Sequence, residues 1–137
     1  NSPGGSVTAG LALIDTMQSL DCPVITVGEG VVASMAAVIL ASGDHRQVYR
    51  HTQVLIHQLM GGTGMAQQTD IEIVAQHTAA MRAELDELLA EHGNLSAQEF
   101  HELTERDCWC NAKRALELGL VDEVIAPSKK ALWGRRA

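Results

Sequence analysis

An α/β fold with a largely parallel sheet is predicted from three observations. Short runs of β-branched and aliphatic residues alternate along the chain with segments whose apolar residues recur at helical spacing, which is typical of parallel sheets covered by helices. Hydrophobic residues make up 46% of the 137 residues and aromatic residues only 3%, so the core must be aliphatic. The length suits one domain, and a chain of this size can bury about two-thirds of its unfolded surface.

The first half of the chain is expected to contain two helices and three strands. The first helix is predicted over 6–20, where apolar side chains recur on one face and Gly4-Gly5 precede the N-terminus. The β-branched run Val24–Val27 predicts a buried strand. Small residues predict a second helix over 33–42. Two further strand candidates follow, at Gln47–Arg50 and Val54–His57.

The second half is dominated by one long helix. Thr69 and Glu72 have the spacing of a capping box, and apolar residues then recur at steps of three and four until Gly93-Asn94. A helix of about 23 residues would measure ~35 Å, longer than the body of a small domain. We therefore expect it to project or to pack against a partner. The remaining predicted elements are a helix capped by Ser96 and Glu99, a short helix capped by Asn111 and ending at Gly119, and a last strand over 120–125.

Charge and hydropathy exclude two classes of function. Ten Lys and Arg against seventeen Asp and Glu give a formal net charge of −7. An acidic chain with one Phe and one Tyr lacks the basic field and the stacking platforms of a typical nucleic-acid-binding protein. No apolar run reaches the ~18 residues that a membrane span needs.

The three cysteines indicate a reducing compartment, and we expect a cytoplasmic protein. An odd number of cysteines argues against a disulfide framework. Cys108-Trp109-Cys110 could form half of a metal site, but no second pair of ligands stands nearby. Ordinary buried thiols are the favoured interpretation, and no metal is predicted.

Ser34 is a candidate nucleophile because it stands where the Val24–Val27 strand and its loop give way to a helix. Nearby helix N–H groups favour developing negative charge, and the small residues Ala33 and Ala36 would let a substrate approach. The alternative interpretation is an N-cap or packing serine, since the local sequence is not the Gly-x-Ser-x-Gly elbow.

Three other positions could support chemistry at Ser34. His57 ends an apolar strand and could act as a general base, the alternative being a surface histidine. Asp107 stands at a helix end and, taken alone, is a solvated charge. Glycines before a helix, as at Gly4-Gly5, leave N–H groups free to bind an oxyanion, although turns also use such pairs. The stretch 61–64 lacks the Lys-Ser/Thr of a P-loop, so nucleotide binding there is rejected.

Six segments, taken together and in order, are more specific than any one of them: Asn1–Gly10 with Asp15–Met17, Ala33–Met35, Val54–Gln58, Gln68–Ile73, Thr104–Asp107 and Ala115–Val124. They resemble, in turn, the oxyanion segment, the nucleophile motif, the catalytic-histidine strand, the start of the long handle helix, the acid segment, and the last helix and strand of the ClpP family. Members of that family are the proteolytic subunits of the Clp protease. The resemblance covers residues 1–125, nearly the whole chain.

The resemblance implies a serine endopeptidase site. By position, Ser34 would be the nucleophile and His57 would take its proton and later protonate the leaving amine. Asp107 would hold the tautomer of His57 and stabilise the imidazolium. The backbone N–H groups of Gly5 and Met35 would form the oxyanion hole.

The resemblance also implies a fold, a substrate and partners. A ClpP/crotonase-like domain is expected over 1–125, with a handle region at 59–93 and a tail at 126–137. Met60, Gly61 and Gly62 would belong to an edge strand that pairs with an extended polypeptide substrate. Two stacked seven-subunit rings would enclose the sites, and an AAA+ ATPase unfoldase would feed them. ATP would be used by that partner, and this chain would need no cofactor.

Several positions depart from the family pattern. Leu59 stands where Pro is usual, Ala36 stands where Gly is usual, and Val31-Val32 replace polar and small residues. None of these changes removes a triad member. The family has roughly sixty more residues upstream, so we expect a fragment of a longer protein with unpaired sheet edges and poor stability in isolation.

Two alternative functions stay open. The first is a catalytically silent assembly subunit, because the divergence lies around Ser34 although the triad is intact. The second is a crotonase-type acyl-CoA enzyme, which would use paired backbone N–H groups to hold a thioester oxyanion. Such an enzyme needs no ordered Ser, His and Asp set, so the presence of all three disfavours it.

Overall fold

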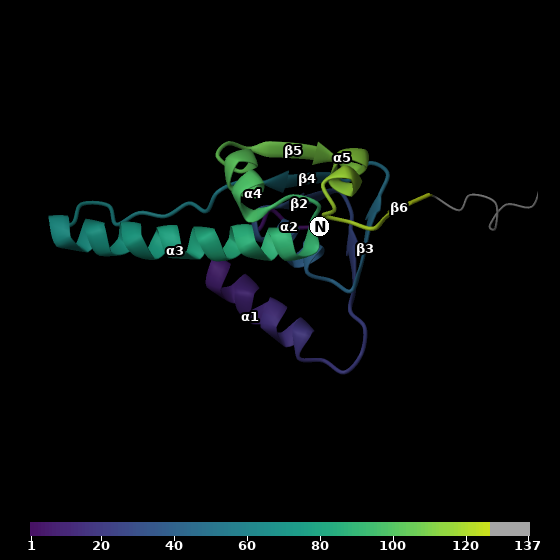
Figure 1. Cartoon of the computed structure of the whole chain (residues 1–137), viewed down its shortest axis with the longest axis horizontal. Helices are drawn as coiled ribbons and strands as arrows, with labels where there is room; N and C mark the ends of the chain where they lie inside the picture. Colours follow the sequence, from purple (N-terminus) through teal and green to yellow (C-terminus); the bar gives the residue numbers. More distant parts are fainter. Residues whose placement is uncertain (127–137) are drawn as a thin grey trace, which may run out of the picture.

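The computed structural model describes residues 1–126, which contain six strands and five helices (Figure 1). In chain order the elements are α1 (Val7–Gln18), β1 (Ile25–Gly28), β2 (Val31–Ala33), α2 (Met35–Ala41), β3 (His45–Tyr49), β4 (Gln53–Ile56), α3 (Gln68–His92), α4 (Ala97–Leu103), β5 (Cys108–Asn111), α5 (Ala112–Glu117) and β6 (Glu123–Ile125). Most of the predicted tail, including its basic residues, lies outside the described residues.

The strands form two small sheets, ordered β1-β3-β6 and β2-β4-β5. Three of the four pairings within residues 1–126 are parallel, and only β4 and β5 run antiparallel. The α/β class and the largely parallel pairing are therefore confirmed. The division into two sheets was not predicted, because β2 and β5 are three and four residues long and carry no periodic pattern.

One face of β1 is exposed, so the prediction of a buried strand is wrong for that face. Ile25 is 60% exposed and Val27 is 46% exposed. The opposite face is covered by α2: the Thr26 hydroxyl donates to the Leu40 carbonyl at 2.7 Å. β-branched residues therefore mark the strand correctly but do not show how many of its faces are covered.

Capping boxes are predicted at the N-termini of two helices, α3 and α4. Ser96 and Glu99 form one at α4, with both reciprocal hydrogen bonds present. The box predicted at Thr69 and Glu72 is wrong, because the extended residue before α3 is Gln67, which makes no side-chain cap. Thr69 lies inside the first turn, where its hydroxyl cannot act as an N-cap.

The long helix α3 projects from the body, as predicted (Figure 1). It has 25 residues, of which only Leu85, Asp86 and Leu89 in its second half are buried. Ile71 and Ile73 in its first half are 48% and 59% exposed. Despite this length, no helix within residues 1–126 is apolar enough over a sufficient stretch to cross a membrane.

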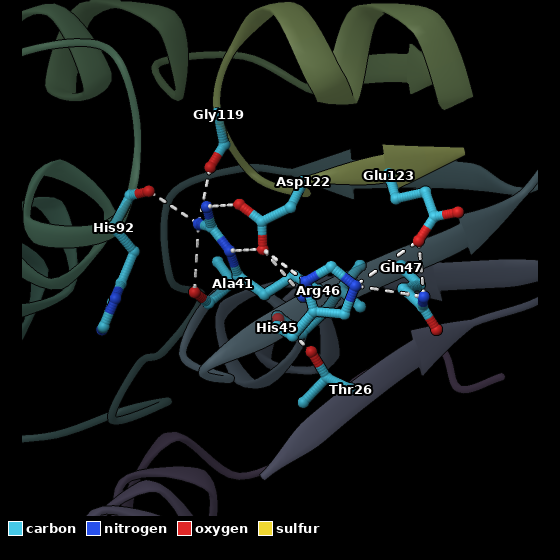
Figure 2. A network of polar contacts seen from close by, with 10 residues as sticks. Thr26, Ala41, His45, Arg46, Gln47, His92, Gly119, Asp122 and Glu123 are labelled. Carbon is cyan, nitrogen blue, oxygen red and sulfur yellow. Dashed lines mark hydrogen bonds and ion pairs between the residues drawn. The ribbon is translucent and has the colours of Figure 1, made fainter. Parts of the chain in front are cut away.

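Arg46 on β3 fixes the ends of several elements (Figure 2). Its guanidinium donates to the carbonyl oxygens of His92 at 2.6 Å, Gly119 at 2.7 Å and Ala41 at 3.4 Å, and it pairs with the carboxylate of Asp122. A cation is favourable at the C-terminal ends of α2 and α3, where carbonyl groups lack helical partners. This contact orients both helices relative to the β1-β3-β6 sheet.

Candidate active site

Ser34 occupies a strained backbone conformation between β2 and α2. Its φ of 58° and ψ of −129° make it the one non-glycine residue with positive φ in the described chain. Its N–H donates to the Leu55 carbonyl at 2.8 Å, which ties it to β4. Although Ser34 stands at the N-cap position, its side chain makes no capping hydrogen bond. The hydroxyl is therefore not used as a cap, and a strained strand-to-helix turn is typical of exposed nucleophiles.

Three neighbouring strands bring Ser34, His57 and Asp107 to one end of the β2-β4-β5 sheet. Ser34 directly follows β2, His57 directly follows β4, and Asp107 directly precedes β5. The antiparallel ladder ends at the pair Ile56 and Cys108, so His57 and Asp107 lie opposite each other one step further along. Ser34 and His57 line one cavity, and His57 and Asp107 line an adjoining one.

The three candidate side chains are assembled but not hydrogen-bonded to one another. Within residues 1–126, no hydrogen bond joins Ser34 to His57 or His57 to Asp107. Catalytic hydrogen bonds are often long in unliganded enzymes and shorten when substrate binds. The fold thus brings the three side chains to one end of the sheet without hydrogen bonds between them.

The N-terminal segment runs beside β2 and reaches the Ser34 turn. Ser2 forms a parallel bridge with Val32, and its carbonyl accepts from the Ala33 N–H at 2.9 Å. Gly4 has a φ of 95°, and a Cβ there would lie 2.6 Å from both the Ala33 oxygen and the Ser34 Cβ. Only glycine fits this close approach.

Gly5 and Met35 are the two residues expected to supply the oxyanion hole. Both residues line the cavity that contains Ser34. A Cβ at Gly5 would meet no atom within 4 Å, so this position is not sterically restricted. The sequence singled out Gly4 and Gly5 together, and the structure separates them: Gly4 permits the close approach, and Gly5 lines the cavity.

The cavity beside Ser34 has a volume of about 170 Å³ and mostly apolar walls. Two charged residues of α3, Arg82 and Asp86, also line it. Asp86 is 5% exposed, and its Oδ2 lies 2.7 Å from the Nδ1 of His101. Sequence reasoning missed Arg82 and Asp86. The available signal was the spacing of four residues between Arg82 and Asp86, which flank Leu85 on the face of α3 predicted to be apolar.

The predicted substrate-binding residues lie between His57 and α3. Met60 lines the Ser34 cavity and is 84% exposed, whereas Gly61 and Gly62 line a separate groove against α3. The segment is not a strand in this structure, contrary to the expected edge strand. Its backbone pairs with no strand within residues 1–126, and an extended second chain could supply one.

The cysteine pair lies on β5 next to Asp107. The Cys108 and Cys110 sulfur atoms are 3.8 Å apart, and Cys110 is fully buried. Burial, followed by the neighbouring Cys108, raises the pKa of the Cys110 thiol to about 12. Within residues 1–126, no group of three His, Cys, Asp or Glu side chains could hold a metal ion.

Comparison with known proteins identifies the family. The family model described as Clp protease matches residues 1–128. This chain belongs to the Clp protease family. The ClpP resemblance expected from the sequence is thereby confirmed.

Individual Clp relatives are similar over most of this chain. The ATP-dependent Clp protease proteolytic subunit of Lactococcus lactis subsp. cremoris (strain SK11) is 44% identical over 128 residues, which cover 91% of this chain and 64% of the relative. The subunit of the same name from Streptococcus sanguinis (strain SK36) is 44% identical over 131 residues, which cover 93% of this chain and 67% of the relative. The chain therefore spans a little under two thirds of the length of the Lactococcus relative.

Proposed function

We propose that this chain is the proteolytic part of a Clp-type serine endopeptidase, which cleaves unfolded polypeptides through an acyl-enzyme. The observation that carries the proposal is the strand order β2-β4-β5. In this order His57 follows the middle strand, between the strands next to Ser34 and Asp107, which supports their roles as base, nucleophile and orienting acid. Membership of the Clp protease family supports the same activity.

The proposed chemistry assigns one role to each residue. The Ser34 Oγ attacks the scissile carbonyl carbon while His57 takes its proton, and His57 then protonates the leaving amine. Asp107 orients the His57 ring and stabilises its charged form. The N–H groups of Gly5 and Met35 donate to the oxyanion, and losing one such donor typically costs ~3–4 kcal/mol of transition-state stabilisation. Water then hydrolyses the ester, with His57 as the general base.

Substrate recognition is proposed to use backbone pairing together with the apolar cavity. The backbone of Met60, Gly61 and Gly62 would form a ladder with an extended polypeptide, which supplies the neighbouring strand that this segment lacks. The apolar walls of the cavity beside Ser34 would receive one side chain of that polypeptide.

Assembly is proposed to follow the family. Subunits would form two stacked seven-subunit rings in the cytoplasm, and an AAA+ ATPase unfoldase would deliver substrates. ATP would be consumed by that partner, and this chain would need no cofactor. The projecting half of α3, which has no buried residue and exposes Ile71 and Ile73, would be the surface that packs against another subunit.

A catalytically silent assembly subunit is the second candidate. It is favoured by one observation, the absence of hydrogen bonds between Ser34, His57 and Asp107 within the described residues. A silent subunit would still enter the rings but would not react with substrate.

Covalent labelling with a fluorophosphonate probe separates these two candidates. In the full chain we expect the probe to react at Ser34, and mass spectrometry of the digested protein would identify the modified peptide. The Ser34→Ala variant is the matched control and should remain unlabelled. An assembled, folded protein that the probe leaves unmodified at Ser34 would contradict the endopeptidase and support the silent subunit.

A further inference from the structure

Arg82 reaches from α3 to the chain segments that carry the candidate triad. Its side chain is only 17% exposed. The Nη1 group donates to the Gln58 Oε1 at 3.1 Å, and the Nη2 group donates to the His101 carbonyl and to the Glu105 carboxylate, both at 3.0 Å. One guanidinium thus joins three segments: the end of β4, the helix α4 and the turn that follows α4.

Gln58 connects the histidine segment to the acid segment. It directly follows His57, and its backbone N–H donates to the Thr104 carbonyl at 2.9 Å. Its side-chain Nε2 donates to the Glu105 carbonyl, also at 2.9 Å. Thr104 and Glu105 immediately precede the Arg106-Asp107 pair, so Gln58 holds this turn beside His57.

The contacts of Gln58 and Arg82 lie just beyond the end of the β4-β5 ladder. The β4-β5 pairing ends at Ile56 and Cys108, so His57 and Asp107 lie beyond the last ladder pair. Beyond that pair, the Gln58 contacts join the two segments, and Arg82 binds Gln58 and Glu105 from α3.

We propose that Arg82 is a positioning residue, which holds the His57 and Asp107 segments at their working separation without touching the reacting atoms. This inference rests on the proposed endopeptidase function. A guanidinium can bind several acceptors in one plane, which a lysine ammonium cannot reproduce.

The test compares Arg82→Ala with the natural full chain. We measure the rate of fluorophosphonate labelling at Ser34, and kcat and KM on a fluorogenic peptide. Misplacement of reacting groups by about 1 Å costs on the order of 100-fold, so labelling and kcat should both fall by roughly 100-fold while KM changes less than about threefold. Free guanidinium at low concentration should restore part of the lost rate, and sodium chloride at equal ionic strength should not.

Arg114→Ala is the matched control, because Arg114 is a half-exposed arginine of α5 that pairs with Glu117 and does not line the Ser34 cavity. It should leave labelling and kcat unchanged. Arg82→Lys provides a second variant that retains the charge and fills most of the same space. It should fold and show an intermediate loss of kcat.

The outcomes distinguish this proposal from the function on which it rests. Labelling of Ser34 in the natural chain, with unchanged labelling in folded Arg82→Ala or Arg82→Lys, would overturn the positioning role alone. A rise in KM with unchanged kcat would also overturn it, since Arg82 would then bind substrate. A loss that guanidinium does not restore would assign Arg82 to general stability. A natural chain that is not labelled at Ser34 would overturn both proposals.

Discussion

Ser34 and Gly4 have complementary backbone conformations at the candidate site. A non-glycine residue at φ 58° destabilises the folded state by on the order of 1–3 kcal/mol, which the surrounding contacts must offset. The Ser34 N–H bond to Leu55 supplies one such contact from β4. Gly4 supplies the space, because any side chain there would collide with the Ser34 turn. Gly4 therefore cannot carry a side chain without displacing the Ser34 turn, although it has no reactive group itself.

Exchanging the two glycines for alanine should have unequal effects. Gly4→Ala forces a Cβ to 2.6 Å from two atoms at a positive φ, so we expect a stability loss of about 3 kcal/mol and the loss of most Ser34 labelling. Gly5→Ala meets open space and keeps its N–H, so it should change stability by roughly 0.5 kcal/mol or less. Urea unfolding and probe labelling measure both quantities. Equal losses in the two variants would refute this assignment.

Cys110 and Cys22 should react very differently with iodoacetamide. Cys22 is exposed, whereas Cys110 is buried and has a pKa raised to about 12. The thiolate is the reactive form, so Cys22 should be alkylated at mildly alkaline pH while Cys110 stays unmodified until the chain unfolds. Peptide mass spectrometry at timed intervals distinguishes the two sites. Comparable rates in the native protein would show that β5 opens readily.

The raised pKa of Cys110 also makes the free energy of unfolding depend on pH. The folded chain holds the Cys110 proton more tightly than the unfolded chain, whose thiol has the ordinary pKa of 9.0. This contribution to the free energy of unfolding is fully present below pH 9.0 and is lost as the pH rises toward about 12.

At the scale of elements, Arg46 and Asp122 join β3 to the turn before β6. The hydrogen bond from the Arg46 side chain holds the pKa of the Asp122 carboxyl below its usual value. The Asp122 carboxylate also accepts from the Arg46 backbone N–H at 2.8 Å. One carboxylate therefore binds both the backbone and the side chain of the same residue, which fixes the direction of Arg46 toward the helix ends (Figure 2).

Asp122→Asn should destabilise the fold at neutral pH and should have no effect on stability in acid. We expect a loss of about 1 kcal/mol, since the carboxylate is 35% exposed and partly screened by water. A lowered folded pKa contributes stability above the unfolded value of 3.8 that is lost as the pH falls through the folded value. Urea unfolding at several pH values measures the difference, with the exposed Asp21→Asn as control. A stability difference between the variant and the natural chain that persists at low pH would contradict a role for the charge of Asp122.

At the scale of the whole molecule, the sequence predicts correctly those elements that carry a strong local signal, such as a helix cap. The caps at Ser96 and Asn111 were read correctly, because a capping side chain bonds to backbone only three residues away. The strands β2 and β5 were missed, because they exist through pairing with β4 and have little pattern of their own.

The candidate site was predictable by resemblance and not by local pattern. Ser34, His57 and Asp107 each had an ordinary alternative interpretation when taken alone. Their proximity depends on pairings between residues far apart in the chain, which periodicity does not report. The contacts of Arg82 are not predictable for the same reason, since its partners lie on three other segments.

The antiparallel pairing of β4 with β5 also bears on when the site can form during synthesis. Ser34 and His57 leave the ribosome well before residues 108–111, and Asp107 reaches its place only when that late strand pairs with β4. Contacts between distant parts of a chain form slowly because their loops must close first. Under the proposed chemistry, a nascent chain would thus carry its nucleophile and its base without the residue that orients them. The order of translation would then delay peptidase activity until the domain is nearly complete.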